Sequence, residues 1–268
     1  MPAIWTSVAQ KIVVENVEFA DVLQYPSRDY DHRISYGEDE LNFGLLWLPD
    51  TRASSPLASP PLLIFIHGGC WLNSFDVEHS FAASTTLADA GIAVWSLEYR
   101  RTGDAGGGWP GTFDDIKTAI AAKDSLAAYG VDTSQFAIAG HSAGGHLALL
   151  AGSSAEQAET IIGLAAIADI DAYGRGSNSC QTATAAFMNA EPDAAPDLYA
   201  SANPMEQGLH RNTFFLHGDQ DAIVPLSQSQ NAQGNLITIA GAGHFDWIHP
   251  GTPAFASLLT LLQEQLLQ

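Results

Sequence analysis

Six short, nearly continuous apolar runs recur along the chain, and they predict buried strands. The runs lie at 62–66, 92–97, 136–140, 161–168, 213–218 and 236–241. Apolarity that is continuous rather than alternating is typical of strands covered on both faces, and therefore of a parallel sheet. Two further segments, 12–23 and 41–48, are expected to form an antiparallel pair of strands at one edge of this sheet.

Helical patterns fall between most of the apolar runs. Four helices are expected, at about 79–90, 113–129, 143–152 and 253–266. Asp114 and Asp115 suit the positive N-terminal end of the second helix, after a break at Pro110-Gly111. Strands and helices in alternation predict right-handed crossovers and a doubly wound α/β sheet.

Two segments depart from this alternation. Residues 171–210 are rich in glycine, asparagine and proline, with two short helical patterns, and we expect them to form a lid-like insertion. The Ser/Pro-rich stretch at 50–61 directly precedes a core strand, so it is expected to be a surface loop rather than a linker. We therefore expect residues 1–268 to form one domain with a mostly parallel sheet.

Composition narrows the class of protein. The 268 residues are 46% apolar, enough to build a large core. No apolar run approaches the roughly 18 residues of a membrane span, and the N-terminus shows no basic region followed by an apolar block. Cys70 and Cys180 lie far apart and indicate neither a disulfide framework nor a zinc site. These features predict a reduced, cytoplasmic protein.

The formal net charge of −20 includes only three lysines. Such a surface repels nucleic acid and anionic membranes, which argues against both as partners. Solubility is the simplest interpretation of the charge; adaptation to a salty environment, where salt screens self-repulsion, is the alternative. The expected partner is a small molecule, and a homodimer is compatible with the sequence.

One serine lies where a strand pattern changes directly into a helix pattern. The stretch GHSAG at 140–144 fits G-x-S-x-G, the turn that exposes a nucleophilic serine between a strand and a helix. Gly140 and Gly144 are expected because larger side chains would collide in so tight a turn. We interpret Ser142 as a nucleophile; the alternative is a glycine-rich turn without chemistry.

A serine nucleophile needs a base and an acid that orients the base, and in this type of fold the chain order is Ser, acid, His. His244 follows the last predicted strand, where a loop can bring its imidazole over the serine. The other downstream histidines suit this role less well: His146, His210, His217 and His249. For the acid we favour Asp221, on the loop after the preceding strand, over Asp219, which is expected to shape the turn.

Acyl transfer also needs hydrogen-bond donors for a negatively charged oxygen. HGGCW at 67–71 follows the first central strand and matches the start of an HGGG-type loop. The expected donors are the backbone N–H groups of Gly69, Cys70 and Ala143. Cys70 itself is expected to be inert packing, since no cation lies near it in sequence. No metal-ligand spacing, G-x-G-x-x-G or Walker pattern occurs, so no metal or cofactor is predicted.

Four aromatic residues are expected to bind substrate. Phe187 and Tyr199 belong to the 171–210 segment, and Trp71 and Trp109 follow two neighbouring strands. Together they could line a small pocket over the serine, suited to short acyl groups. The alternative is that these aromatic side chains form a small additional core under the segment.

With HGGCW, GHSAGG, HGDQDAIVP and GAGHF in this order, the chain resembles the α/β-hydrolase superfamily from about residue 40 to its end. HGGxW and the stretch 99–116 resemble the esterase and kynurenine-formamidase-like group, near the hormone-sensitive-lipase-like esterases. Cys70 stands where HGGG has its third glycine, which favours the formamidase-like members. The resemblance implies a cofactor-free serine carboxylesterase acting on short acyl esters. The alternatives are a formamidase or amidase for N-formyl amides such as N-formylkynurenine, a small-peptide hydrolase, and a non-catalytic binding protein.

Overall fold

The six apolar runs all form strands of an eight-stranded sheet in the computed structural model, which describes residues 14–50 and 59–267. Its strands are β1 (His32–Ser35), β2 (Phe43–Trp47), β3 (Pro61–Ile66), β4 (Ala93–Leu97), β5 (Asp132–His141), β6 (Thr160–Leu164), β7 (Thr213–Gly218) and β8 (Asn235–Ile239). The order across the sheet is β1-β2-β4-β3-β5-β6-β7-β8. β2 pairs antiparallel with β1 and β4, and the other pairs are parallel. The predicted α/β class with an antiparallel edge is confirmed.

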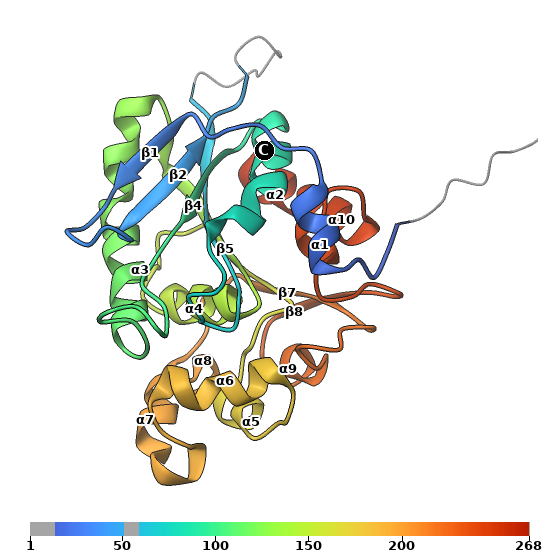
Figure 1. Ribbon diagram of the computed structural model, residues 1–268. Helices are drawn as coiled ribbons and strands as arrows, with labels where there is room; N and C mark the ends of the chain where they lie inside the picture. The colour runs from blue at the N-terminus through green and yellow to red at the C-terminus, as the bar shows by residue number, and fades with distance from the viewer. Residues whose placement is uncertain (1–13, 51–58, 268) are drawn as a thin grey trace, which may run out of the picture.

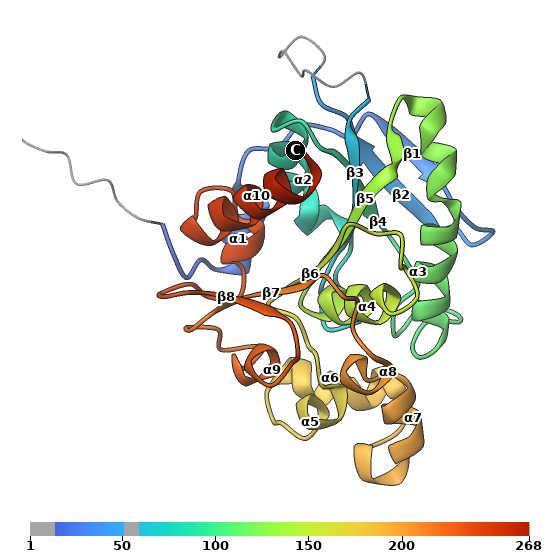
Figure 2. The same ribbon diagram turned by 180° about the vertical axis from the view of Figure 1, so that it is seen from behind.

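Helices cover both faces of the sheet, as Figures 1 and 2 show from opposite sides. α2 (Phe81–Asp89) and α10 (Pro253–Leu266) pack on one face, and α3 (Gly111–Ala122) and α4 (Ala143–Gly152) on the other. Short 3-10 helices extend α2 and α3: η1 (Val77–Ser80) and η2 (Lys123–Tyr129). Neighbouring residues of β3 belong to two different core clusters, because alternate side chains point to opposite faces.

The segment between β6 and β7, where the sequence predicts an insertion, has more helices than the two short ones expected. It contains α5 (Ile170–Gly174), α6 (Ser179–Met188), η3 (Pro192–Ala194), α7 (Pro196–Ser201) and α8 (Pro204–Gln207). The yellow and orange helices in Figure 1 gather beyond the end of the sheet at which β6 finishes. α9 (Ser227–Gln230) and η4 (Asp246–Ile248) follow β7 and β8. Parallel strands present ligand-binding loops at this carboxyl end.

The expectation of a strand over 12–23 is wrong for its described part. Residues 14–18 form no strand, and α1 (Phe19–Gln24) follows them. β1, at 32–35, pairs with β2 instead. The apolar positions of this stretch pack against the core without a sheet partner, since Val17 and Val22 belong to the cluster under α10. Residues 12 and 13, most of the proposed 50–61 loop and most of the N-terminal stretch assessed for a leader lie outside the described residues.

Cys70 and Cys180 form a disulfide, with their Cα atoms 5.1 Å apart and 110 residues between them in sequence. The expectation of no disulfide is therefore wrong. Sequence distance did not indicate the pairing because the insertion folds back over the loop after β3. Disulfides persist mainly in oxidising compartments, so this bond removes one argument for a cytoplasmic location. Among the residues described, no helix is long and apolar enough to cross a bilayer.

Candidate active site

Ser142 lies at the turn between β5 and α4. Its backbone has φ 57° and ψ −119°, a conformation that only a tightly packed turn maintains. A Cβ on Gly140 would lie 2.1 Å from the carbonyl oxygen of Gly144. A Cβ on Gly144 would lie 2.2 Å from the carbonyl oxygens of both Ile66 and His67. The two glycines of the motif are therefore required by the close approach of backbone to backbone.

His244 and Asp221 meet on the loops after β8 and β7. Nδ1 of His244 lies 2.8 Å from Oδ2 of Asp221, and Oδ1 accepts the N–H groups of Ile223 and Val224 at 2.9 and 2.8 Å. Burial alone would raise the pKa of Asp221, but the nearby charge of His244 and hydrogen bonds from His217 and His244 outweigh it and hold this pKa well below its usual range. The ionised carboxylate can only accept hydrogen bonds, so Nδ1 carries a proton, and in the neutral form of the ring Nε2 is the nitrogen with a lone pair.

The neighbouring carboxylate, Asp219, hydrogen-bonds to the backbone of the turn after β8. It is exposed, and its Oδ1 accepts the N–H of Gly241 at 2.8 Å. The side chain of Asp221, in contrast, is only 1% exposed. The two acids therefore differ in burial and in partner.

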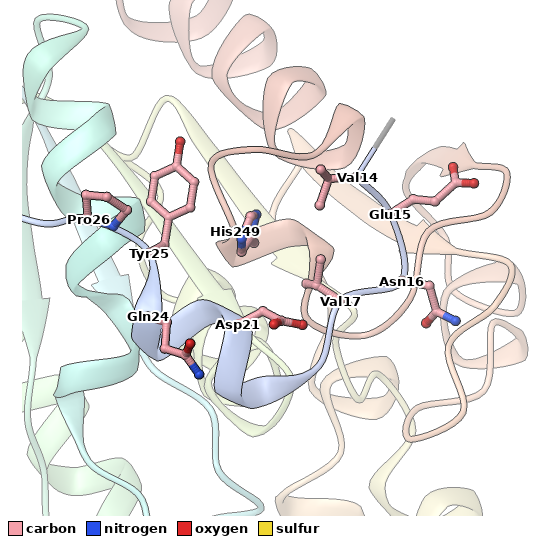
Figure 3. Close-up of a pocket in the computed structure, with 9 residues that line it drawn as sticks. All are labelled: Val14, Glu15, Asn16, Val17, Asp21, Gln24, Tyr25, Pro26 and His249. Atoms are coloured by element: carbon pink, nitrogen blue, oxygen red, sulfur yellow. The ribbon is translucent and has the colours of Figure 1, made fainter. Parts of the chain in front are cut away.

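The remaining downstream histidines are held mainly by other groups. His146 and His210 hydrogen-bond to backbone groups. His217 hydrogen-bonds to the Ser229 hydroxyl and the Val224 carbonyl, and its Nε2 also lies 3.4 Å from Oδ2 of Asp221. His249 packs edge-on against Tyr25 at 4.7 Å and lines a separate shallow hollow of about 510 Å³ (Figure 3). None of the nine residues that line this hollow belongs to the group around Ser142.

The loop after β3 passes directly over the serine. A Cβ on Gly68 would lie 3.1 Å from Cβ of Ser142, and Gly69 and Cys70 adopt φ of 107° and 53°. In the part of the chain that the structure describes, no hydrogen bond uses the N–H of Gly69 or Cys70. Ala143 is the first residue of α4, and the N–H groups of a helix's first turn have no partner within the helix. No hydrogen bond within the described residues therefore occupies these three N–H groups.

A buried carboxylate holds this loop in place, and sequence reasoning missed it. Glu98 Oε1 lies 3.1 Å from Nε2 of His67 and 3.2 Å from Nη1 of Arg101, while Oε2 accepts the N–H of Val77 at 3.2 Å. The hydroxyl of Tyr99 donates to the carbonyl of His67 at 2.6 Å. Burial would raise the pKa of Glu98, but His67 and Arg101 lower it further than burial raises it. An acid directly after the apolar run 92–97 was the available signal.

Ser142 and His244 line one pocket of about 460 Å³. Its walls are largely apolar and include Leu72, Ile223 and the disulfide. Among the described residues that line it there is no Asp, Glu, Lys or Arg. The pocket can therefore hold an uncharged group of modest size without leaving a charge unpaired.

Two further histidines line this pocket and stay neutral. Burial lowers the pKa of His141 to about 3 and holds that of His79 well below its usual range, with neighbouring histidines adding to both effects. Nε2 of His141 lies 2.9 Å from the carbonyl oxygen of His244, and Nε2 of His79 accepts the N–H of Gly68 at 3.2 Å. They orient the two loops that flank the serine. No three His, Cys, Asp or Glu side chains of the described chain are grouped to hold a metal ion.

The four aromatic residues predicted to bind substrate do not line this pocket. Trp71, Phe187 and Tyr199 are fully buried in the core cluster beside α3 and α4, and Trp109 packs against it. The rings of Trp71 and Phe187 stack at 4.8 Å, and the N–H of Trp109 donates to the carbonyl of Phe187 at 2.8 Å. These large buried aromatic side chains anchor the insertion on the domain. They form a core under the segment 171–210, which was the alternative interpretation of the sequence.

Comparison with curated proteins finds relatives that are named esterases. Esterase LipC of Mycobacterium tuberculosis (strain ATCC 25618 / H37Rv) is 30% identical over 271 residues, which cover 88% of this chain and 66% of LipC. LipM of the same strain, named a probable carboxylic ester hydrolase, is 28% identical over 80% of this chain and 53% of its own length. The chain thus spans between about half and two thirds of these curated relatives.

Two solved structures show the same fold at low identity. A truncated form of a carbohydrate esterase from gut microbiota has a TM-score of 0.76 and 23% identity, covering 91% of this chain and 100% of that one. Esterase B from Lactobacillus rhamnosis (HN001) has a TM-score of 0.72 and 20% identity, covering 89% and 87%. The sheet is thus that of an α/β hydrolase. The BD-FAE family model matches residues 48–236, well over half of the chain, and the protein therefore belongs to the BD-FAE family.

Proposed function

We propose that the protein is a cofactor-independent serine hydrolase that cleaves short-chain carboxylic esters. The observation that carries this proposal is the shared pocket: Ser142, in its strained turn, lines it together with His244, whose Nδ1 is hydrogen-bonded to the buried Asp221. The esterase names of the relatives support the same class of reaction.

The proposed first step forms an acyl-enzyme. The Ser142 hydroxyl gives its proton to the free Nε2 of His244 while Oγ attacks the acyl carbon. The carbonyl oxygen becomes an oxyanion that accepts hydrogen bonds from the N–H groups of Gly69, Cys70 and Ala143. As the bond to the alcohol breaks, His244 returns the proton to the leaving oxygen, and Asp221 stabilises the transient imidazolium.

Water then completes the proposed reaction. It gives a proton to Nε2 of His244 and attacks the acyl carbon through the same oxyanion-stabilised intermediate. The bond to Ser142 breaks, Oγ regains the proton, and the carboxylic acid leaves. No group outside the chain and water is needed for this sequence of steps.

The pocket favours a neutral ester over the alternative substrate N-formylkynurenine. An amino acid carries both an ammonium and a carboxylate group, and no Asp, Glu, Lys or Arg is among the described residues that line the pocket. Burying either charge without a partner is costly. We also propose that the insertion covers the pocket, because Ser179 and Cys180 at the start of α6 belong to its wall.

A fluorophosphonate probe and an ester panel test the proposal. The probe should label Ser142, and Ser142→Ala should lose about 10⁴-fold or more in kcat while remaining folded. Ser153→Ala, at the end of the same helix α4, is the matched control and should keep wild-type rates. Labelling of another residue, or turnover retained in Ser142→Ala, would contradict the mechanism. Faster cleavage of N-formylkynurenine than of p-nitrophenyl acetate or butyrate would contradict the substrate class.

A further inference from the structure

The N-terminal strap, which we define as residues 14–25, is fixed to the loop after β8 by a buried acid. Asp246 is fully buried, and its Oδ2 and Oδ1 accept the N–H groups of Asn16 and Val17 at 2.6 and 2.7 Å. A buried carboxylate requires hydrogen-bond donors, and backbone N–H groups supply them here. Asp246 stands two residues after His244, so the strap is attached next to the proposed base.

α1, within this strap, directs one aromatic ring into the active-site pocket. The ring of Phe19 lies 5.7 Å from that of Phe75, 5.5 Å from that of Phe245 and 5.7 Å from that of His79, between centroids. The three phenylalanines are half buried, and all belong to the wall of the pocket that contains Ser142. We call Phe19, Phe75 and Phe245 the aromatic wall.

Phe19 is the one described residue of α1 that lines this pocket. Asp21 and Gln24 line the separate hollow shown in Figure 3, and Leu23 is 53% exposed. Phe19 and Phe245 both lie outside residues 48–236, the part that matches the family model. Two of the three rings of the aromatic wall therefore come from segments that flank the matched region, while Phe75 comes from within it.

We propose that Phe19 is a specificity-determining residue: the strap places its ring so that the aromatic wall limits the length of the apolar group that the pocket accepts. This inference rests on the proposed ester hydrolysis at Ser142. Removing the ring opens space beside Phe75 and Phe245, and each additional methylene buried there favours binding by about fourfold. Asp246 is a positioning residue in the same device, because it holds the strap that carries Phe19.

Chain-length profiles of the 268-residue chain test the proposal. We would measure kcat/KM for p-nitrophenyl esters from acetate to dodecanoate and for acetate esters of alcohols of increasing length. Phe19→Ala should move the optimum of at least one series to longer chains, with a rise of roughly tenfold or more in the octanoate-to-acetate or octyl-to-methyl ratio. Phe19→Trp should move it to shorter chains. Asp246→Asn, whose amide keeps a single acceptor oxygen, should shift it in the same direction as Phe19→Ala.

Leu23→Ala is the matched control, because it shortens an exposed side chain of the same helix, and its profiles should be those of the wild type. Unchanged profiles in both Phe19 variants, or an equal shift in Leu23→Ala, would overturn the inference. Wild-type hydrolysis of p-nitrophenyl acetate that is lost in Ser142→Ala tests the proposed function separately. If the wild type hydrolyses no ester, both proposals fail; if it does and the profiles stay unchanged, only the role of Phe19 fails.

Discussion

Cys180→Ala should destabilise the protein strongly, because the Cys70–Cys180 bond closes a long loop. The cysteines are 110 residues apart in sequence, and the chain-entropy account gives about 5 kcal/mol at 25 °C for a loop of that length. Removing a native disulfide typically costs about 2–5 kcal/mol. We expect a loss in the upper half of that range, since the bond also ties the insertion to the loop over Ser142.

Two measurements test whether Cys70 and Cys180 are covalently bonded rather than only in contact. Thiol titration in denaturant without reductant should find no free thiol in the wild type and two after reduction. Urea unfolding, followed by tryptophan fluorescence, should show that reductant lowers the free energy of unfolding of the wild type but leaves Cys180→Ala unchanged. Cys180→Ala keeps the backbone N–H of Cys70, so kcat/KM should fall by less than the 10²–10³-fold cost of a lost oxyanion donor.

Two outcomes would refute this reasoning. Two thiols in the denatured, unreduced protein would show that the bond is absent, and a stability change below about 0.5 kcal/mol, the usual range of a surface substitution, would show that it does not restrain the chain. The same thiol titration on protein taken directly from cells bears on location, because a reducing cytoplasm keeps most cysteines free.

Three further predictions concern the site and its histidines. Asp221→Asn should lower kcat by about 10⁴-fold while Asp219→Asn, which alters a surface turn, changes it little; equal losses in steady-state kinetics would reverse the assignment. In a pH–rate profile, kcat/KM should rise between about pH 5 and 8 as the imidazole base loses its proton, and a flat profile would exclude a histidine base. Burial lowers the pKa of His141 to about 3 and that of His146 to about 4, so below the unfolded-state pKa of about 6.5 only the unfolded chain takes up these two protons. Urea unfolding should therefore show the free energy of unfolding falling by roughly 1 kcal/mol per pH unit for each histidine as the pH drops toward about 4. A constant free energy of unfolding over this range would contradict their buried, neutral state.

The central strands could be predicted because burial on both faces leaves continuous apolar runs in the sequence. The run at 236–241 also forms a strand, β8, but the expectation that it is buried is wrong, because β8 is an edge strand with half-buried or exposed residues. Each of the six apolar runs became a strand from β3 to β8, and the predicted ranges 143–152 and 253–266 are the observed bounds of α4 and α10. β1 was missed because it is an edge strand whose residues are only half buried or exposed, as in His32 and Arg33. β1 has a single apolar side chain, Ile34, which is too few to give the pattern on which the prediction depends.

The turn around Ser142 and the His244–Asp221 pair could be anticipated for a similar reason. Each depends on a strand end and the few residues that follow it, so spacing along the chain carries the information. The pocket walls depend on contacts between distant segments: Phe19 meets Phe245, and Cys70 meets Cys180. No local period encodes such contacts, which is why the aromatic residues chosen from sequence turned out to anchor the insertion instead.

The turn at Ser142 depends on local contacts and the pocket wall on distant ones, and this difference predicts how the range of accepted esters varies among related proteins. The turn at Ser142 tolerates little change, since a Cβ at Gly140 or Gly144 would collide with backbone atoms at 2.1–2.2 Å. Phe19 is half buried and is held through backbone N–H groups of the strap, so its side chain can change without disturbing those hydrogen bonds. Proteins with the same motifs but a different N-terminal segment should therefore share the proposed acid–base chemistry and differ in the length of the ester that they accept.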